Sequence, residues 1–388
     1  MALEQELKIL LRGATSVTTE KELAEKLSRG RSLRVKLGVD PTTKDLHLGH
    51  TVCLKKMRAF QELGHTGVLI IGDFTARVGD PSGRSETRPV VTPEEIHANA
   101  QTYKEQAFGI LDPEKTELRF NSEWLDPFMS SGKILEYLPK VTHARLTERE
   151  DFKTRISKSE PITMLEIMYP VFQGYDSVAV KADVELGGTD QMFNLLFGRD
   201  MQRDHGQEPQ VTMTLPILVG TDGVKKMSKT YRNAVSIKDK PEDIFGKVMS
   251  VSDDTMWQWA ELLTGLDLTQ MRTMHPMQAK KLLALTITAQ FYGKQGADAA
   301  RTHFERVHSS GELPESMPEF RLPKDKKLFL SQLLALSGLA PSRKEAQRKI
   351  AEGGVRLDGK VAKEDILVEL SSPAVVNLGK RGFVKVLP

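Results

Sequence analysis

The chain has a single cysteine, Cys53, among its 388 residues, so an intramolecular disulfide bond is excluded. We expect Cys53 to be a structural thiol, buried or half-buried in a helix. The nine histidines are scattered along the chain. The sequence contains no cluster of His and Cys, so we expect no metal ion held by the protein. The chain also has no internal repeat and no low-complexity tract.

Long apolar runs are absent as well. No run approaches the roughly 20 residues that span a bilayer, so we expect no membrane partner. The first seven residues, MALEQEL, resemble the start of an amphipathic helix and not a signal peptide. These absences favour a cytoplasmic protein. Hydrophobic residues make up 39% and charged residues 28% of the chain, and its length predicts two or three domains.

Charge is unevenly distributed along the chain. The net charge is +3 overall, but residues 326–388 contain 12 Lys and Arg against 6 Asp and Glu, which gives this tail +6 and leaves −3 for the rest. A basic tail on a slightly acidic body predicts that the tail binds a polyanion.

The first informative motif lies at residues 40–50, with the sequence DPTTKDLHLGH. Apolar residues alternate over 35–39, which predicts a strand, and recur at helical spacing over 54–63, which predicts a helix. A second short buried strand is predicted over 68–71. This strand, turn, helix and strand begin a parallel α/β sheet, and the motif falls at the carboxyl end of a strand, where such sheets bind ligands.

The second motif, KKMSKT, lies at residues 225–230. Residues 216–219 predict a strand that enters it, and Thr221-Asp222-Gly223 predicts a turn. Each motif alone has an ordinary interpretation: two surface histidines, or a solvated lysine cluster or nuclear import signal. Together they supply what a nucleotide triphosphate needs, namely imidazole donors beside a helix N-terminus and lysines on a mobile loop.

This pair of motifs resembles the His-x-Gly-His and Lys-Met-Ser-Lys-Ser signatures of the class I aminoacyl-tRNA synthetases, with Thr230 in place of the last Ser. Three further stretches resemble the bacterial tyrosyl-tRNA synthetases within that class. Residues 169–176 place Tyr169, Gln173 and Asp176 on one face of a helix. Residues 187–191 (GGTDQ) and 79–84 (GDPSGR) are glycine-rich turns that carry carboxylates. The resemblance covers nearly the whole chain.

The resemblance implies a role for each of these residues. Tyr169, Gln173 and Asp80 would hold the ammonium group of tyrosine, Asp176 would accept the hydrogen bond of the phenol, and Gln191 would orient the amino acid. The residues implied in ATP binding are Asp40, Gly49, Gly188, Asp190 and Lys229. Those implied in catalysis are Thr42, His47, His50, Arg84, Lys226 and Lys229.

The implied chemistry needs no nucleophile or general base from the protein. The tyrosine carboxylate attacks the α-phosphorus of ATP, pyrophosphate leaves, and the tyrosyl group then passes to the terminal ribose of tRNA(Tyr). Catalysis is positioning and charge stabilisation, with Mg²⁺ arriving on the triphosphate. One position departs from the family: many tyrosyl enzymes have a second tyrosine where this chain has Lys36. The sequence leaves open whether Lys36 donates to the substrate phenol or points elsewhere.

The predicted fold class is α/β, with three domains. Residues 1–238 form a Rossmann-like parallel-sheet catalytic domain, in which the insertion at about 120–165 makes a homodimer interface by resemblance. Residues 239–320 are expected to form an α-helical domain with Trp257, Trp259, Leu262 and Leu263 in its core, and the resemblance implies that this domain contacts the anticodon arm. Residues 311–323 are expected to be a linker. Residues 321–388 comprise linker and a small α+β domain that resembles the S4 RNA-binding domain.

The tail predicts a first helix with an apolar face and a second helix that starts after Ser342. The apolar face comprises Leu328, Leu330, Leu333, Leu334 and Leu336. The RNA-binding side chains predicted on the second helix are Arg343, Lys344, Arg348 and Lys349. A strand over 355–357 and a hairpin turn at Asp358-Gly359 should follow. The alternative interpretation of the tail is a basic capping subdomain.

Two other functions compete with tyrosine activation. A tryptophanyl enzyme is disfavoured because an indole offers only a donor to Asp176, and because that family usually lacks an S4-like tail. A non-catalytic RNA-binding protein with the same fold is disfavoured because His47, His50, Lys226 and Lys229 are all present.

Overall fold

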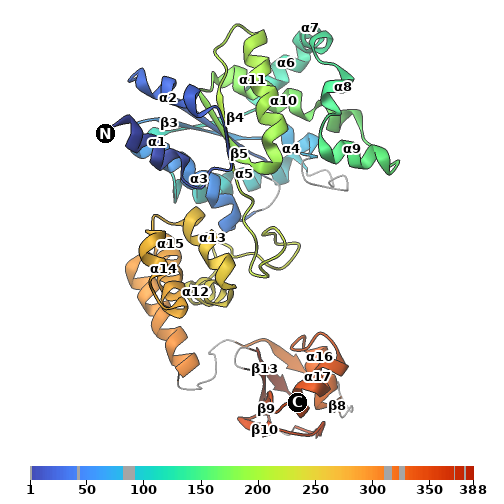
Figure 1. The fold of residues 1–388 in the computed structure, drawn as a ribbon. Coiled ribbons are helices and arrows are strands. Elements are labelled where there is room, and N and C mark those ends of the chain that lie inside the picture. Colours follow the sequence, from blue (N-terminus) through green and yellow to red (C-terminus); the bar gives the residue numbers. More distant parts are fainter. Residues whose placement is uncertain are drawn as a thin grey trace. The chain divides into compact units, whose positions relative to one another are not determined.

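The computed structural model describes residues 2–41, 44–81, 92–309, 317–322, 328–370, 372–379 and 382–388. The chain forms two compact units, Met1–Ala300 and Arg301–Pro388 (Figure 1). No helix in these described stretches is long and apolar enough to cross a membrane.

A six-stranded sheet with strand order β1-β6-β5-β2-β3-β4 forms the centre of the first unit. Five of its strands are parallel, and β1 pairs with β6 in the antiparallel direction at one edge. The strands are β1 (Ser16–Thr18), β2 (Arg34–Val39), β3 (Thr66–Ile71), β4 (Thr116–Phe120), β5 (Val184–Gly188) and β6 (Val211–Leu215). The predicted strands at 35–39 and 68–71 are confirmed as β2 and β3. Because β2 pairs with β3 on one side and β5 on the other, the strand order reverses here, which is where such sheets hold ligands.

Helices cover both faces of this sheet (Figure 1). A Cβ atom at Gly67 of β3 would meet Met57 of α3, while Gly198 of α11 faces Ser177 of α10 and Glu185 of β5. One face therefore packs on α3 and the other on α10 and α11. The helices of this part are α1 (Leu3–Leu11), α2 (Glu20–Ser28), α3 (Leu48–Glu62), α4 (Thr75–Val78), α5 (Pro93–Phe108), α10 (Met164–Val180) and α11 (Met192–Asp204), with 3-10 turns η1 (Pro113–Lys115) and η3 (Thr189–Gln191).

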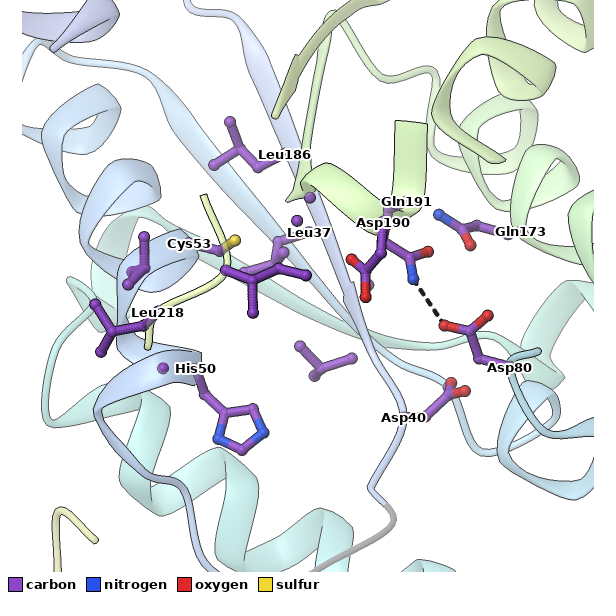
Figure 2. A pocket seen from close by; sticks show the side chains of 18 of the residues that line it. Leu37, Asp40, His50, Cys53, Asp80, Gln173, Leu186, Asp190, Gln191 and Leu218 are labelled. Carbon is purple, nitrogen blue, oxygen red and sulfur yellow. Dashed lines mark hydrogen bonds between the residues drawn. The ribbon is translucent and has the colours of Figure 1, made fainter. Parts of the chain in front are cut away.

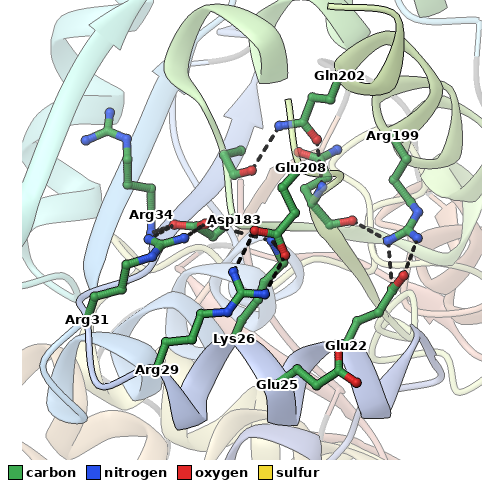
Figure 3. A network of polar contacts seen from close by, with 12 residues as sticks. Glu22, Glu25, Lys26, Arg29, Arg31, Arg34, Asp183, Arg199, Gln202 and Glu208 are labelled. Carbon is green, nitrogen blue, oxygen red and sulfur yellow. Dashed lines mark hydrogen bonds and ion pairs between the residues drawn. The ribbon is translucent and has the colours of Figure 1, made fainter. Parts of the chain in front are cut away.

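A cluster of ion pairs fastens α2 to the start of β5 (Figure 3). Lys26, although almost fully buried, lies 3.2 Å from a carboxylate oxygen of Glu208 and 3.9 Å from one of Asp183, the residue before β5. Arg31 donates to both oxygens of Asp183, and Arg29 donates to both oxygens of Glu208. These paired hydrogen bonds lower the pKa of Glu208 to about 2. The network fixes the end of β5 that is remote from its carboxyl end.

Between β4 and α10 the chain forms a group of short helices that pack on α10. Their shared core contains Leu125, Phe128, Phe152, Val171 and Phe172. The helices are α6 (Ser122–Ser130), α7 (Lys133–Tyr137), η2 (Leu138–Lys140), α8 (His143–Leu146) and α9 (Glu150–Ser157). These helices lie in the insertion that the sequence analysis expects at about 120–165.

Residues 241–309 are mainly helical, which agrees with the helical domain expected over 239–320 except at residues 319–321, which form a strand. Trp259, Leu262 and Leu263 are buried, but Trp257 is only half-buried and lies under the guanidinium of Arg272, 4.7 Å from the ring centre. The helices are α12 (Pro241–Ser250), α13 (Asp253–Leu263), α14 (Leu268–Arg272) and α15 (Pro276–Ser309). α15 is kinked at Gly293, whose φ of +67° is not helical.

The second unit has a five-stranded sheet of order β10-β9-β12-β13-β7, a two-stranded pair β8–β11 and two helices that contribute to one apolar core. Its elements are β7 (Glu319–Arg321), β8 (Leu328–Phe329), α16 (Leu330–Leu336), α17 (Arg343–Ala351), β9 (Val355–Leu357), β10 (Lys360–Ala362), β11 (Leu367–Val368), β12 (Ala374–Leu378) and β13 (Gly382–Leu387). The second predicted helix, the strand over 355–357 and the turn at Asp358-Gly359 are confirmed. Both turn residues have positive φ, as a two-residue hairpin with this twist requires.

Two predictions for the tail are wrong in part. Leu328 belongs to β8 and not to a helix, and Leu336 is 61% exposed. Leu330, Leu333 and Leu334 share the inward face of α16, whereas six residues of helical rotation carry Leu336 to the other side. The expected linker is also shorter than predicted, because residues 319–321 form β7 and pair with β13.

Candidate active site

A pocket of about 440 Å³ opens at the carboxyl ends of β2 and β5 (Figure 2). It brings together all the predicted catalytic, ATP-binding and tyrosine-binding residues that the structure describes. These are Asp40, His47, Gly49, His50, Asp80, Tyr169, Gln173, Asp176, Gly188, Asp190, Gln191, Lys226 and Lys229. The other two, Thr42 and Arg84, lie outside the described residues. Residues as far apart in the sequence as Asp40 and Lys229 therefore meet in one cavity. They lie on turns after the strands of one parallel sheet, on the helices beside it, or on the loop that follows β6.

The two histidines of the first motif hold each other and the start of α3. The Nδ1 atom of His47 accepts a hydrogen bond from the amide of Gly49 at 3.2 Å, and the Nδ1 atom of His50 accepts one from the amide of His47 at 3.1 Å. The centres of the two rings are 3.9 Å apart, and the ring planes are tilted by 35°. Because both Nδ1 atoms act as acceptors, the proton of each neutral ring is on Nε2, which leaves that N–H to donate.

Burial keeps both rings neutral. Desolvation, followed by the positive charge of Lys229, lowers the pKa of His47 to about 4. Desolvation and the neighbouring His47 lower the pKa of His50 to about 3. At neutral pH the site therefore presents two uncharged N–H donors at the positive end of a helix, an arrangement that suits an anion.

The lysine motif lies on a loop that the structure pins at several points. Met227 is buried, and its amide donates to the carbonyl of Leu218 at 2.8 Å. The side chain of Asn233, 3% exposed, accepts from the amide of Ser228 and donates to the carbonyl of Lys226. Lys226 and Lys229 themselves are exposed and reach the pocket from this anchored loop.

The strand predicted at residues 216–219 is wrong. β6 ends at Leu215, and only Val219 makes an isolated antiparallel bridge, to Lys226. Pro216 has no N–H to extend the ladder, so the chain leaves the sheet at that point and enters the loop. The predicted turn at Thr221-Asp222-Gly223 is present, and Gly223 has a φ of +71°.

The loop returns to the first motif after the lysines. The amide of Leu48 donates to the carbonyl of Val235, and the amide of Ile237 donates to the carbonyl of Leu46. The ammonium of Lys229 lies 3.2 Å from a carboxylate oxygen of Asp45, which precedes the histidines by two residues. The two motifs are thus held against each other by backbone hydrogen bonds and an exposed ion pair.

The opposite side of the pocket carries a chain of side-chain hydrogen bonds, one of which, from Gln191 to Asp80, is drawn in Figure 2. Gln191 donates to Asp80 at 2.7 Å and accepts from Asn194 at 3.0 Å, and Asn194 also donates to Gln173 at 3.0 Å. Tyr169, on the turn of α10 before Gln173, donates to Asp40 at 2.9 Å. Two carboxylates and an amide oxygen therefore converge at one place, which can bind a cation.

Asp176 forms a separate polar point deeper on α10. It is 3% exposed, and it accepts from the indole N–H of Trp124 at 2.8 Å and from the amide of Asn121 at 3.4 Å. Burial raises the pKa of Asp176 to about 7, although Lys36, Trp124 and Asn121 oppose the rise. An acceptor held this way inside a pocket selects a ligand that carries a hydroxyl at the matching position.

The structure settles the question about Lys36. Its ammonium lies 2.7 Å from Glu185, and it donates to the hydroxyl of Ser177 at 2.7 Å and to the carbonyl of Gln173 at 3.0 Å. An ammonium has three N–H donors, and these three partners use them all. Lys36 therefore points into the core between β2 and α10 and does not donate to a ligand in the pocket.

Three further residues at the pocket have environments that bear on its chemistry or its shape. Cys53 of α3 lines the pocket, and burial raises the pKa of its thiol to about 12, so it is an unreactive thiol, in agreement with the expected structural role. Burial also raises the pKa of Asp190. A side chain at Gly72 would clash, because a Cβ atom there would lie 2.1 Å from Asp40.

Four residues of the site were missed in the sequence. Asn121 and Trp124 hold Asp176, Asn194 links Gln173 to Gln191, and Asn233 anchors the lysine loop. Asn121 follows β4, the neighbour of β3, so a polar residue directly after a strand was a usable signal. Among the described residues, no group of three or more His, Cys, Asp or Glu side chains is placed to hold a metal ion.

Comparisons with known proteins agree with this geometry. The family model for class I tRNA synthetases (W and Y) matches residues 28–309, and the S4 domain model matches residues 330–370. A tyrosine–tRNA ligase from Oleidesulfovibrio alaskensis is 50% identical and one from Aquifex aeolicus is 48% identical, each over 100% of both chains. A tyrosyl-tRNA synthetase from Archaeoglobus fulgidus, crystallised with L-tyrosine, has the same fold, with a TM-score of 0.63, 23% identity and coverage of 78% of this chain and 99% of that one.

The fold and the two motifs place this chain in the class I aminoacyl-tRNA synthetases, in the group for tryptophan and tyrosine. Identity of about half over the full length of both chains then places it among the tyrosine–tRNA ligases of that group. The second unit carries an S4 domain.

Proposed function

We infer that this chain activates L-tyrosine with ATP and transfers it to tRNA(Tyr). The observation that carries the inference is that one pocket joins a phosphate-binding side, built from His47, His50 and Lys229, to an amino-acid side that ends at Asp176. The competing tryptophanyl function is disfavoured because relatives of about half identity over the full length are tyrosine–tRNA ligases. A phenol can donate to Asp176 and also offers an oxygen that can accept, whereas an indole N–H can only donate.

The first step is an in-line displacement at phosphorus. A carboxylate oxygen of tyrosine forms a bond to the α-phosphorus of ATP, the bond to the β-phosphate oxygen breaks, and pyrophosphate leaves with the electron pair. The neutral imidazoles of His47 and His50 and the ammonium groups of Lys226 and Lys229 stabilise the negative charge that develops on the phosphates. Thr42 and Arg84 are proposed to add donors there. Mg²⁺ enters with ATP as part of the substrate, bound through phosphates and water.

The amino-acid side positions tyrosine for this attack. The ammonium group of tyrosine binds Asp80, Tyr169 and Gln173, and Gln191 orients the amino acid through its bond to Asp80. Asp176 accepts the phenolic proton. Gly188 and Asp190 contact the ribose of ATP, with Asp40 and Gly49 beneath the nucleotide. The rate then comes from holding the two substrates in a reactive geometry.

Charging of tRNA(Tyr) tests the whole reaction. The purified chain with ATP and Mg²⁺ should attach radiolabelled tyrosine to tRNA(Tyr), and tryptophan or phenylalanine offered in the same way should give little product. Charging with tryptophan in preference to tyrosine would assign the chain to the other branch of its family.

Tyrosine binding should depend on pH through Asp176. The ionised carboxylate is the stronger acceptor for the phenol, and burial raises its pKa to about 7, so the binding form is lost as pH falls through that value. The affinity for tyrosine should therefore weaken by about tenfold from about pH 8 to about pH 6. His47 and His50, with pKa values of about 4 and about 3, do not titrate in this range. Calorimetric titrations of wild type and Asp176→Asn check this, and the variant should show a flat profile.

We propose that the segment at about 120–165 makes a homodimer interface. Apolar side chains on these helices and on the start of α10 are exposed: Met129, Leu135, Leu138, Ile156, Met164 and Leu165. An exposed apolar group of this kind supports an interface between copies of the chain. Leu135→Asp combined with Met164→Asp should halve the mass measured by light scattering. Leu336→Asp, which changes an equally exposed leucine in the second unit, should leave the mass unchanged.

We propose that the three domains divide the work: residues 1–238 carry out catalysis, residues 239–320 contact the anticodon arm, and residues 321–388 bind RNA through the S4 domain. We also propose that the reaction takes place in the cytoplasm.

The basic residues of α17 differ in whether their charge is already paired. Arg348 pairs with Glu345 and Glu352, and Lys349 pairs with Glu352, whereas Lys344 is exposed and makes no ion pair with a described residue. Arg343 donates to Ser331 at 3.2 Å. Lys344 is therefore the cation best placed to meet a phosphate.

A salt titration of tRNA binding separates these cations. Lys344→Ala should weaken binding and reduce the slope of log K against log salt by about 0.7–0.9, the value for one lost phosphate contact. Arg348→Ala should change the slope less, because two carboxylates already offset its charge. An unchanged affinity and slope in both variants would remove α17 from the RNA-binding surface.

A further inference from the structure

A fully buried ion pair lies directly behind the amino-acid side of the pocket. Lys36 of β2 and Glu185 of β5 are register partners on neighbouring parallel strands, are 0% and 1% exposed, and lie 2.7 Å apart. Removing two charges from water is costly, and apolar residues of similar size often stabilise a protein as well or better. The pair therefore calls for an explanation other than stability, and its neighbours supply one.

Apart from the contact between the two charges, the hydrogen bonds of the pair go to α10 and to Gln210, the residue before β6. Lys36 donates to the carbonyl of Gln173 and the hydroxyl of Ser177, and Glu185 accepts from Ser177 at 3.1 Å and from the amide of Gln210. The remaining contact is to the side chain of Gln173, whose Nε2 donates to the same Glu185 oxygen that meets Lys36, at 3.3 Å. Gln173 is thus held by the pair at both its backbone and its side chain.

These contacts decide which end of the Gln173 amide faces the pocket. A carboxylate can only accept, so Glu185 takes the NH₂ end. The Oε1 end then points away from Glu185 and accepts from Asn194 at 3.0 Å, and Gln173 is one of the residues that line the pocket. An amide oxygen attracts an ammonium group, whereas an NH₂ group in the same place repels it. The orientation of a single amide therefore decides whether this side of the pocket accepts a cation.

We propose that the Lys36–Glu185 ion pair is a positioning device that orients the Gln173 amide and so gives the site its preference for the α-ammonium group of the amino-acid substrate. This rests on the proposed function, since Gln173 is taken to contact the ammonium of tyrosine. Lys36 holds the carboxylate of Glu185 in place through the ion pair, and Glu185 sets the orientation of the amide. Neither residue touches the substrate.

The test compares binding of L-tyrosine with binding of deaminotyrosine, in which a hydrogen replaces the α-ammonium group. In the first variant, Lys36→Met with Glu185→Leu, both charges are removed at nearly constant volume. The preference for L-tyrosine over deaminotyrosine should fall by roughly 10–150-fold, the worth of one hydrogen bond to a charged group. Any change at Asp176, whose pKa Lys36 lowers, acts on both ligands through their phenols and cancels in this ratio.

A charge-reversed variant, Lys36→Glu with Glu185→Lys, separates orientation from packing. It can re-form an ion pair, but the ammonium on β5 now attracts the Oε1 end of Gln173 and turns the NH₂ end toward the pocket. The preference should again be lost even where thermal unfolding matches the wild type. A purely structural pair would instead be rescued by the reversal. Arg155→Met with Glu166→Leu is the control, since that 5% exposed ion pair does not contact Gln173.

This test distinguishes failure of the ion-pair proposal from failure of the proposed function. A wild-type chain that binds no L-tyrosine would refute the proposed function itself. A wild type that prefers L-tyrosine, with the same preference retained in the apolar and the reversed variants, would refute only the role of the ion pair. Loss of the preference in both, with the control variant unaffected, is the result that the structure predicts.

Discussion

Replacing Lys229 with alanine should slow the formation of tyrosyl-adenylate by roughly 10²–10³-fold, the usual cost of losing one group that stabilises charge in a transition state. Lys229 is exposed, lines the pocket and forms an ion pair with Asp45. We expect the phosphates of ATP to compete with Asp45 for its ammonium group. Tyrosine affinity should hardly change, because the amino-acid side lies elsewhere in the pocket. Stopped-flow measurement of a single turnover gives the rate, and equilibrium titration gives the affinity.

The same loop provides the control. Lys225 lies one residue before Lys226, but its ammonium sits 5.0 Å from the ring centre of Tyr231 and does not line the pocket. Lys225→Ala should therefore stay within about twofold of the wild-type rate. His47→Asn should lower the rate of tyrosyl-adenylate formation about as much as Lys229→Ala does, because asparagine keeps the helix cap but lacks the imidazole Nε2 donor. Weak tyrosine binding with a normal single-turnover rate in Lys229→Ala or His47→Asn would contradict these assignments.

Replacing Asp176 with alanine should weaken the preference for tyrosine over phenylalanine by roughly 10–150-fold, since a hydrogen bond to a buried charge is lost for one amino acid and not for the other. Tyrosyl-tRNA synthetases are themselves the established example of this kind of selection. In this chain the carboxylate is held by Trp124 and Asn121. The ratio of the two activation rates is measured on one preparation, so partial unfolding of the variant cancels. A ratio equal to that of the wild type would remove Asp176 from phenol recognition.

The sequence predicted the parts of the site that depend on local pattern. The strand β2, the helix α3 between the motif and β3, and the shared face of Tyr169, Gln173 and Asp176 on α10 follow from periodicity over a few residues. Their convergence followed from the rule that turns after parallel strands meet at one edge of the sheet. The resemblance to a known family added the roles.

The rest depended on tertiary contacts that no local pattern contains. The partner of Lys36 is Glu185, and only the pairing of β2 with β5 brings them into register. Trp124 reaches Asp176 from a helix that packs on α10, and Asn233 reaches back across the lysine loop. The incorrect strand at 216–219 arose because apolar residues after Pro216 resemble a strand but leave the sheet.

The most direct test of the central claim is the exchange of labelled pyrophosphate into ATP, measured with the full chain, Mg²⁺ and one amino acid at a time. It needs no tRNA and reports the adenylate step alone. The structure predicts exchange with L-tyrosine and far less with tryptophan or phenylalanine, together with loss of the exchange in Lys229→Ala and its persistence in Lys225→Ala. Exchange that depends on tryptophan, or no exchange with any amino acid by a folded chain that still binds tRNA, would contradict the account.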